Sequence, residues 1–134
     1  NNIARLNDIN GEYEKAIILY RRALALHASI DDLDGMSIVA NNIGHNMIKV
    51  GEEDSAMYYY KLSLDYALAN GHKKQIAVSL ENIGTRFFNL GLSDSCYSYY
   101  YRARQLKLES NNQRTIGYNS KNFAELYINV NKLD

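Results

Sequence analysis

The 134-residue sequence contains no proline, no tryptophan and a single cysteine, Cys96. A lone cysteine can form neither an internal disulfide nor a multi-cysteine metal site. An excess of either charge is also missing, because 15 Lys and Arg residues balance 15 Asp and Glu residues. A neutral chain lacks the positive surface with which proteins hold nucleic-acid phosphates. We therefore expect no direct nucleic-acid partner.

Long apolar runs are absent as well. No stretch approaches the roughly 18 uninterrupted apolar residues of a membrane-spanning helix, so we expect no membrane insertion by this segment. The first residues, Asn1-Asn2-Ile3-Ala4-Arg5, include no initiator Met and do not have the shape of a signal peptide. We expect the chain to be a fragment of a larger protein, and we favour a cytoplasmic location for it.

Signatures of catalysis and metal binding are missing too. The sequence shows no nucleophile beside a base, no paired carboxylates and no glycine-rich phosphate loop. His27, His45 and His72 lack the short spacing of metal ligands. We therefore expect no catalytic site, no metal and no cofactor.

What the sequence does contain is a repeat. Asn2-Ile3-Ala4 returns as Asn42-Ile43-Gly44, as Asn82-Ile83-Gly84 and as Asn122-Phe123-Ala124, and 42−2 = 82−42 = 122−82 = 40 residues. Other positions keep the same step: Gly11, Gly51 and Gly91; Ala16, Ala56 and Cys96; Tyr20, Tyr60 and Tyr100. Because Cys96 stands where the other copies have alanine, we expect it to fill a small slot between helices.

Apolar residues spaced three and four apart predict helices throughout, and no period-two pattern predicts a strand. Gly11, Gly51 and Gly91 are expected to end helices in the left-handed conformation, while Asp54 and Asp94 are expected as N-caps. The acids between 30 and 34 should accept backbone N–H groups of the helix that follows. The predicted helices cover residues up to 10, 13–29, 34–50, 54–70, 73–90, 94–111 and 114–130.

Small residues and one ring at fixed places resemble the tetratricopeptide (TPR) repeat family. In the second copy these positions are Gly44, Gly51, Ala56, Tyr60 and Ser63. The resemblance covers essentially the whole chain, although the period is 40 instead of the usual 34 and the proline that commonly ends a repeat is missing. Long repeats of this kind are similar to the TPR arrays of bacterial sensor and regulatory proteins and to kinesin light chains.

The resemblance implies an all-α fold in which antiparallel helix hairpins stack as a right-handed TPR solenoid. Residues 1–134 would form one repeat domain. It would comprise a partial first repeat at 1–33, a second at 34–72, a third at 73–112 and the first helix of a fourth at 113–134.

In this family the first helix of each hairpin, the A helix, lines a concave groove that binds extended peptides. The repeated asparagine is the sharpest feature, because its amide both donates and accepts and can pair with one peptide unit. A second reading, in which these asparagines bond a neighbouring helix, stays open. The resemblance implies groove positions at Asn2, Asn42, His45, Lys49, Glu81, Asn82, Phe88, Lys121, Asn122 and Glu125.

The resemblance therefore implies a non-catalytic scaffold that binds a protein or an extended peptide, as the recognition or sensor segment of a larger bacterial signal-transduction protein. Two alternatives remain. One is a structural spacer or self-association module, with a homo-oligomer formed through the exposed last helix. The other is an accessory segment of an enzyme whose catalytic domain lies outside this chain.

Overall fold

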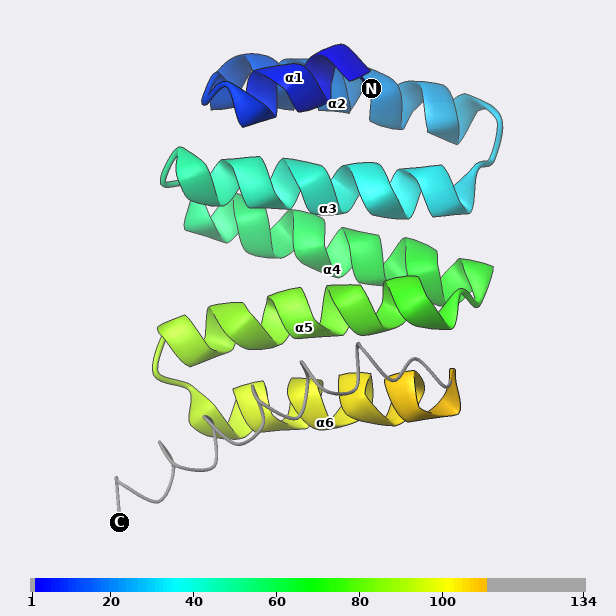
Figure 1. Ribbon diagram of the computed structural model, residues 1–134, viewed down its shortest axis with the longest axis vertical. Helices are drawn as coiled ribbons and strands as arrows, with labels where there is room; N and C mark the ends of the chain where they lie inside the picture. The colour runs from blue at the N-terminus through cyan, green and yellow to red at the C-terminus, as the bar shows by residue number, and fades with distance from the viewer. Residues whose placement is uncertain (1, 111–134) are drawn as a thin grey trace. The chain divides into compact units, whose positions relative to one another are not determined.

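The computed structural model describes residues 2–110, which form six α-helices joined by short turns (Figure 1). The helical pattern predicted over these residues is confirmed, with helix ends that differ from the predicted ones by at most two residues. The predicted helix at 114–130 lies outside the described residues. The helices are α1 (Asn2–Ile9), α2 (Tyr13–Ser29), α3 (Leu33–Lys49), α4 (Glu53–Asn70), α5 (Lys73–Asn89) and α6 (Ser93–Glu109).

Backbone packing divides the chain into two compact units, residues 1–71 and residues 72–134. In the first unit α1 packs on α2, α2 on α3 and α3 on α4, and in the second unit α5 packs on α6. Each contact pairs helices that follow one another in the chain, which is the arrangement expected of antiparallel hairpins. The two units are described separately below.

A glycine ends the A helix of every described hairpin. Gly51 has φ +83°, and the next residue, Glu52, donates its backbone N–H to the Met47 carbonyl at 2.9 Å. This is a Schellman ending, in which the left-handed residue turns the chain and satisfies carbonyls at the helix end. Gly11 and Gly91, with φ +80° and +77°, close the other two hairpins in the same way. The prediction for these glycines is confirmed.

The prediction that Asp54 and Asp94 are N-caps is wrong. Glu52 and Leu92 occupy those cap positions, and neither side chain bonds the helix. The glycine turn itself fixes where the next helix starts, because the backbone carbonyl of Glu52 already accepts from Ala56 N at 2.9 Å. Asp54 and Asp94 lie in the first helical turn, where a negative charge interacts favourably with the helix dipole and stabilises the helix.

The turn between α2 and α3 does use a side-chain cap, as predicted. Asp32 Oδ1 accepts from Gly35 N at 3.0 Å, while Asp32 Oδ2 bonds His27 Nδ1 at 2.8 Å. The hydrogen bond from Gly35 is the main cause that lowers the pKa of Asp32, although burial opposes it, and His27 contributes further lowering. Asp31, with φ +54°, stands one repeat before Gly71, with φ +72°, so one left-handed position recurs in both connections.

A tyrosine ring lies against a glycine in two of the hairpins. A Cβ placed on Gly44 would lie 2.9 Å from the Tyr60 ring and 3.2 Å from the Ala56 carbonyl. A Cβ on Gly84 would lie 3.0 Å from the Tyr100 ring. The absence of a side chain at this position therefore lets α3 approach α4, and α5 approach α6, until ring and backbone touch.

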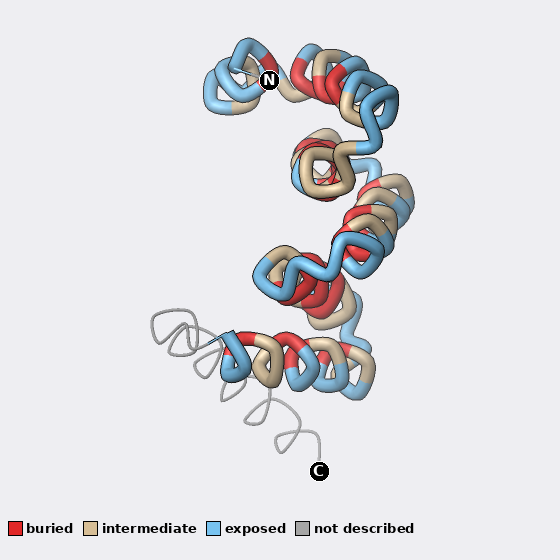
Figure 2. The backbone as a smooth tube through the Cα atoms, turned by 90° about the vertical axis from the view of Figure 1, so that its right-hand side faces the viewer, coloured by how far each residue is buried: buried red, intermediate tan, exposed pale blue. Residues whose placement is uncertain are grey.

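The residues that repeat with a step of 40 build the core. Figure 2 shows buried positions on the sides of the helices that face their neighbours within each unit. Cys96 is fully buried like its counterparts, which confirms that it fills the same small slot. Among the fully or nearly fully buried residues are Ala4, Ala16, Tyr20, Ile43, Ala56, Tyr60, Ile83, Cys96 and Tyr100.

Two buried serines join α3 to α4. Ser37 Oγ donates to the Ser63 carbonyl at 2.8 Å, and Ser63 Oγ donates to the Ser37 carbonyl at 2.8 Å. The two hydroxyl oxygens also lie 3.2 Å apart. One repeat later, Ala77 and Ala103 occupy the same positions and are buried as well. The slot therefore accepts either a reciprocal serine pair or two methyl groups.

This comparison predicts the effect of removing the serines. Ser37→Ala and Ser63→Ala should each lower the free energy of unfolding by about 1 kcal/mol, the usual net value of one hydrogen bond. The double variant should lose less than the sum, because both single variants lose the shared contact between the hydroxyls. Urea unfolding of wild type, both single variants and the double variant measures these free energies, with exposed Ser29→Ala as the control. Strict additivity would show that the serines do not act as a pair.

Candidate functional site

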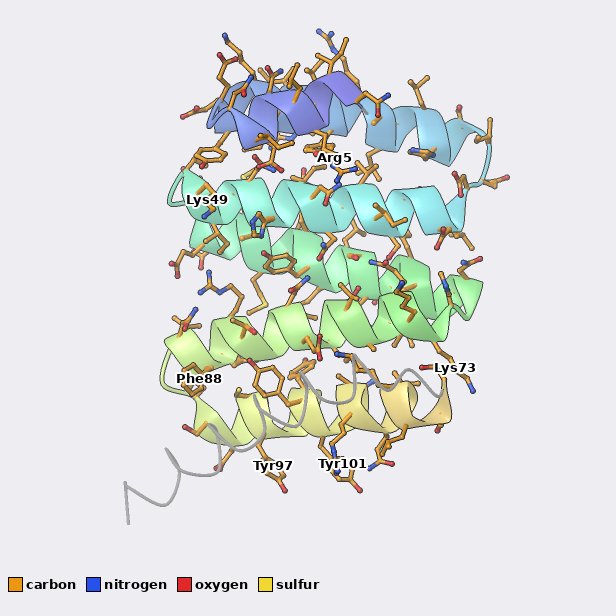
Figure 3. The ribbon with its side chains drawn as sticks, in the orientation of Figure 1. Arg5, Lys49, Lys73, Phe88, Tyr97 and Tyr101 are labelled. Carbon is orange, nitrogen blue, oxygen red and sulfur yellow. The ribbon has the colours of Figure 1, made fainter. Side chains whose placement is uncertain are left out.

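Three of the predicted groove residues lie on one stripe of α3. Asn42, His45 and Lys49 are three and four residues apart, which places them on one face of a helix. His45 and Lys49 are exposed and Asn42 is half-buried. Figure 3 shows Lys49 at the C-terminal end of α3. This stripe offers an amide, an imidazole and an ammonium group on adjacent turns.

Among the described residues, Asn42 makes a side-chain hydrogen-bond contact only through its backbone carbonyl. The Asn42 carbonyl accepts from Asn46 Nδ2 at 2.9 Å, whereas the Asn42 amide makes no hydrogen bond to the residues between 2 and 110. A half-buried amide without a partner keeps its donor and its acceptor available. Asn42 therefore fits the ligand-binding reading better than the reading in which it bonds a neighbouring helix.

Helix α1 contributes Asn2, which is exposed, and Arg5 one turn later, also exposed (Figure 3). Arg5 lies close enough to Tyr20 for its charge to act on the hydroxyl. Burial is the main cause that raises the pKa of Tyr20, the Asp8 charge raises it further, and the Arg5 charge lowers it. Arg5, which follows the small residue Ala4 in the repeat, therefore lies near the buried Tyr20.

The same relation is seen directly in the second unit. Thr85, one residue after Gly84, brings its hydroxyl within 2.8 Å of the Tyr100 hydroxyl and donates to the Glu81 carbonyl at 2.8 Å. The hydroxyl of the core tyrosine is thereby satisfied at the outer side of α5. The residue at this position, Arg5, His45 or Thr85, differs in each repeat.

Two of the remaining predicted residues of α5, Glu81 and Phe88, make contacts inside the second unit. Glu81 pairs with Lys107 of α6, and that lysine is only 4% exposed. Asn82 also has an interaction within the structure. Phe88 packs against the buried pair Cys96 and Tyr100, at the turn end of α5 (Figure 3). These contacts give Glu81 and Phe88 a structural role, whatever their exposed edges contact.

The structure thus brings Asn42, His45 and Lys49 together and engages Glu81 and Phe88 elsewhere. The predicted site residues Lys121, Asn122 and Glu125 lie outside the described residues.

Asn46 is one of the buried polar residues that were not predicted from the sequence. Asn46 is fully buried, and its Oδ1 has no hydrogen-bond partner among the described residues. Leu6 and Arg86 stand at the equivalent positions, so the repeat gives no signal for an asparagine there. The only available signal was its spacing of four from Asn42, which places both amides on one face.

The described part of the chain shows neither a metal site nor a membrane span. No cluster of three or more His, Cys, Asp or Glu side chains between residues 2 and 110 could hold a metal ion. No helix in that range is long and apolar enough to cross a bilayer.

Solved structures show the same arrangement of helices. BtubC (BKLC) from P. vanneervenii matches with a TM-score of 0.82 and 24% identity over 94% of this chain and 52% of that one. A candidate kinesin light chain of Podosopora anserina with nearly identical TPR-like repeats matches at 11% identity in two structures. A form with one substitution has a TM-score of 0.76 and the other structure 0.75, over 94% of this chain and 62% and 63% of theirs.

These matches establish the fold. The chain has the all-α fold of TPR-like repeat proteins, built from stacked antiparallel helical hairpins, as the sequence predicted. It spans about half the length of BtubC and less than two thirds of the Podosopora chains. No protein-family model matches the sequence, and no curated protein matches it. The fold alone does not specify a function.

Cys96 provides a test of the packing between α5 and α6. Burial raises the pKa of the Cys96 thiol from 9.0 to about 11, although interactions with Tyr100 and with the Phe88 backbone oppose the rise. Because the folded pKa exceeds the unfolded one, the unfolded state loses its proton first as pH rises. The stability linked to this thiol is complete below pH 9.0 and is lost as pH rises toward about 11.

We therefore expect folded protein at pH 8 to be unreactive toward an aromatic disulfide reagent, and unfolded protein to react at once. Cys96→Ala should fold with a loss of about 1 kcal/mol or less, since Ala16 and Ala56 fill the same slot. The stability difference between wild type and Cys96→Ala should shrink between pH 9 and 11. Rapid labelling of the native protein would contradict the buried placement.

Proposed function

We propose that this chain is the peptide-recognition segment of a larger bacterial regulatory protein. Its A helices hold an extended segment of a partner protein, and each repeated asparagine contacts one peptide unit. Capture of the peptide shifts the conformational equilibrium of the repeats and thereby acts on an attached output domain. The function is non-catalytic and uses no cofactor.

The observation that carries this proposal is the free amide of Asn42. A hydrogen-bonding side chain held half-buried without a partner is unfavourable unless water or a ligand satisfies it. An asparagine amide matches the N–H and C=O of a peptide unit, and this match does not depend on the peptide's side chains. His45 and Lys49 on the same stripe then supply selectivity for acceptors on the peptide.

The asparagines of the other repeats support the proposal unequally. Asn2 is exposed on α1 and belongs to the same unit as Asn42. Asn82 already has an interaction within the protein, so its substitution would also affect the protein itself. Asn42 is therefore the residue whose substitution separates ligand binding from stability most clearly.

The test begins with a phage-displayed library of random 12-residue peptides selected on the 134-residue chain. Fluorescence anisotropy then measures the affinity of enriched peptides for wild type and for Asn42→Ala. We expect the variant to bind about tenfold to a hundredfold more weakly, which corresponds to one or two lost hydrogen bonds. Its thermal melting should be unchanged, because the bond from Asn46 goes to the Asn42 backbone.

Two further variants sharpen the result. Asn70→Ala removes an exposed asparagine from the last turn of α4 in the same unit and should leave affinity unchanged. Asn42→Asp keeps the acceptor and removes the donor, so it should also weaken binding. The proposal fails if no peptide is enriched, or if enriched peptides bind wild type and Asn42→Ala equally. A large drop in melting temperature for Asn42→Ala would assign the residue a structural role instead.

A further inference from the structure

The outward faces of α2 and α4 carry the same order of chemical groups. Each helix has a row of three exposed residues at spacings of four and three, which places them on one face. In both rows an acid comes first, a large apolar residue second and a cation third. The outward rows are Glu14, Ile18 and Arg21 on α2 and Asp54, Tyr58 and Lys61 on α4.

The outward rows lie on the side of each helix that does not pack on the core. Ala16 and Ala56, each two residues after the acid of its row and so about 200° around the helix, are fully buried. Ile18 is 52% exposed and Tyr58 61% exposed. Tyr58 has this exposure although α4 has described helices before and after it in the chain. The packing of neighbouring hairpins therefore leaves this face open.

Side-chain contacts join the two outward rows. Arg21 Nε on α2 donates to the Tyr59 hydroxyl on α4 at 3.3 Å. The Tyr59 ring lies edge to face with the Tyr58 ring, with centroids 5.3 Å apart and an angle of 83° between the planes. The Arg21 bond uses one of the five N–H donors of a guanidinium. The cation of one row and the ring of the other are thus oriented in the free protein, which reduces the entropy lost when a partner binds.

The third repeat shows that the fold does not require this order of groups. The equivalent residues of α6 are Asp94, Ser98 and Tyr101, so a serine and a tyrosine replace the apolar residue and the cation. An acid in the first turn stabilises any helix through the helix dipole, which accounts for Asp94. The dipole gives no reason for the exposed apolar residue and the cation on α2 and α4.

The direction of the two helices decides how the outward rows can meet another surface. Helices α2 and α4 run the same way, and α3, which connects them, runs the opposite way (Figure 1). A two-fold axis perpendicular to the face, midway between the rows, lays α2 of one copy antiparallel on α4 of a second copy, and it repeats every contact. The contacts made in this way, each between one copy and the other, are Glu14 with Lys61, Ile18 with Tyr58 and Arg21 with Asp54.

From this complementarity we infer that the outward face of α2 and α4 is the interface of a two-fold symmetric dimer of this chain. Every acid of the outward rows meets a cation, and the apolar residues meet at the centre, as in the apolar core and polar rim of protein interfaces. A parallel arrangement would place acids on acids and cations on cations. The acid and the cation of one row lie about 10 Å apart along the helix, so they do not pair with each other instead.

The first test measures association of the 134-residue chain by sedimentation equilibrium. We expect a monomer–dimer equilibrium that Tyr58→Asp weakens at least about tenfold, because a charge then has to be buried at the apolar centre. The matched control is Ser98→Asp, which makes the same residue at the equivalent position of α6 and should leave the equilibrium unchanged. Thermal melting of both variants, measured where the chain is monomeric, should match wild type because both positions are exposed.

A charge exchange tests the register of the two copies. Arg21→Glu and Asp54→Lys should each weaken the dimer, because each places like charges opposite one another. Combined in one chain, the two changes restore opposite charges between the copies, so the double variant should dimerise nearly as wild type does. Arg21 and Asp54 stand at opposite ends of different rows, so a bond within one chain does not explain the recovery. The control combines Arg21→Glu with Lys61→Glu, which makes both rows acidic and should stay monomeric.

Several results would overturn the inference. One is a chain that stays monomeric up to about 1 mM, where even a weak specific interface associates. Another is a dimer that Tyr58→Asp and Ser98→Asp weaken equally. A third is a dimer that the combined exchange of Arg21 and Asp54 fails to restore. Insensitivity of the dimer to Arg21→Glu would contradict the pairing of α2 with α4.

This test is separate from that of the proposed function. Asn42→Ala should dimerise like wild type, because Asn42 lies on α3 and outside the outward rows. Tyr58→Asp should in turn leave the affinity for library peptides unchanged.

Discussion

The structure depends on the contact between a tyrosine ring and a glycine backbone in the hairpins. At Gly44 and Gly84 no Cβ intervenes, so the rings of Tyr60 and Tyr100 lie directly on the opposing helix. Most helical stability in proteins comes from such packing and not from the helices themselves. The stripe of Asn42, His45 and Lys49 belongs to the same helix as Gly44, and there His45 and Lys49 are exposed and Asn42 is half-buried.

Much of the fold could be predicted because its signals are local or periodic. A glycine such as Gly51 predicts a left-handed turn where it follows an apolar helix pattern, and the step of 40 aligned core positions such as Ala56 and Tyr60 with their counterparts. The N-caps were predicted wrongly because the geometry of the glycine turn, which sets the first residue of the next helix, outweighed the preference of Asp54 for a cap. Helix ends depend on such backbone hydrogen bonds, and residue preferences alone do not fix the residue at which a helix begins.

The contacts that the sequence did not reveal join residues 26 positions apart on different helices. Ser37 with Ser63 and Glu81 with Lys107 depend on which side chains two particular helices bring together. These pairs are not periodic, because alanines replace the serines in the third repeat and Asn41 and Ala67 replace the ion pair in the second. For the same reason, the repeat predicted Asn42 and Asn82 as equals, whereas in the structure the Asn42 amide makes no hydrogen bond to the residues between 2 and 110 and Asn82 has an interaction of its own.

The stripe of Asn42, His45 and Lys49 on α3 offers hydrogen bonds suited to an extended backbone. His45 and Lys49 are exposed and Asn42 is half-buried, so the core of the hairpin does not depend on their identity. A repeat fold can vary such positions without altering its core, which is why fold alone does not specify the ligand.

The central claim is that Asn42 contacts the backbone of a bound peptide, and the most direct measurement is a crystal structure of the chain with a library-selected peptide. The account predicts an extended peptide along α3 with the Asn42 amide within hydrogen-bond distance of a peptide N–H and C=O. A peptide bound on the second helices of the hairpins, or one that reaches α3 through its side chains alone, would contradict it.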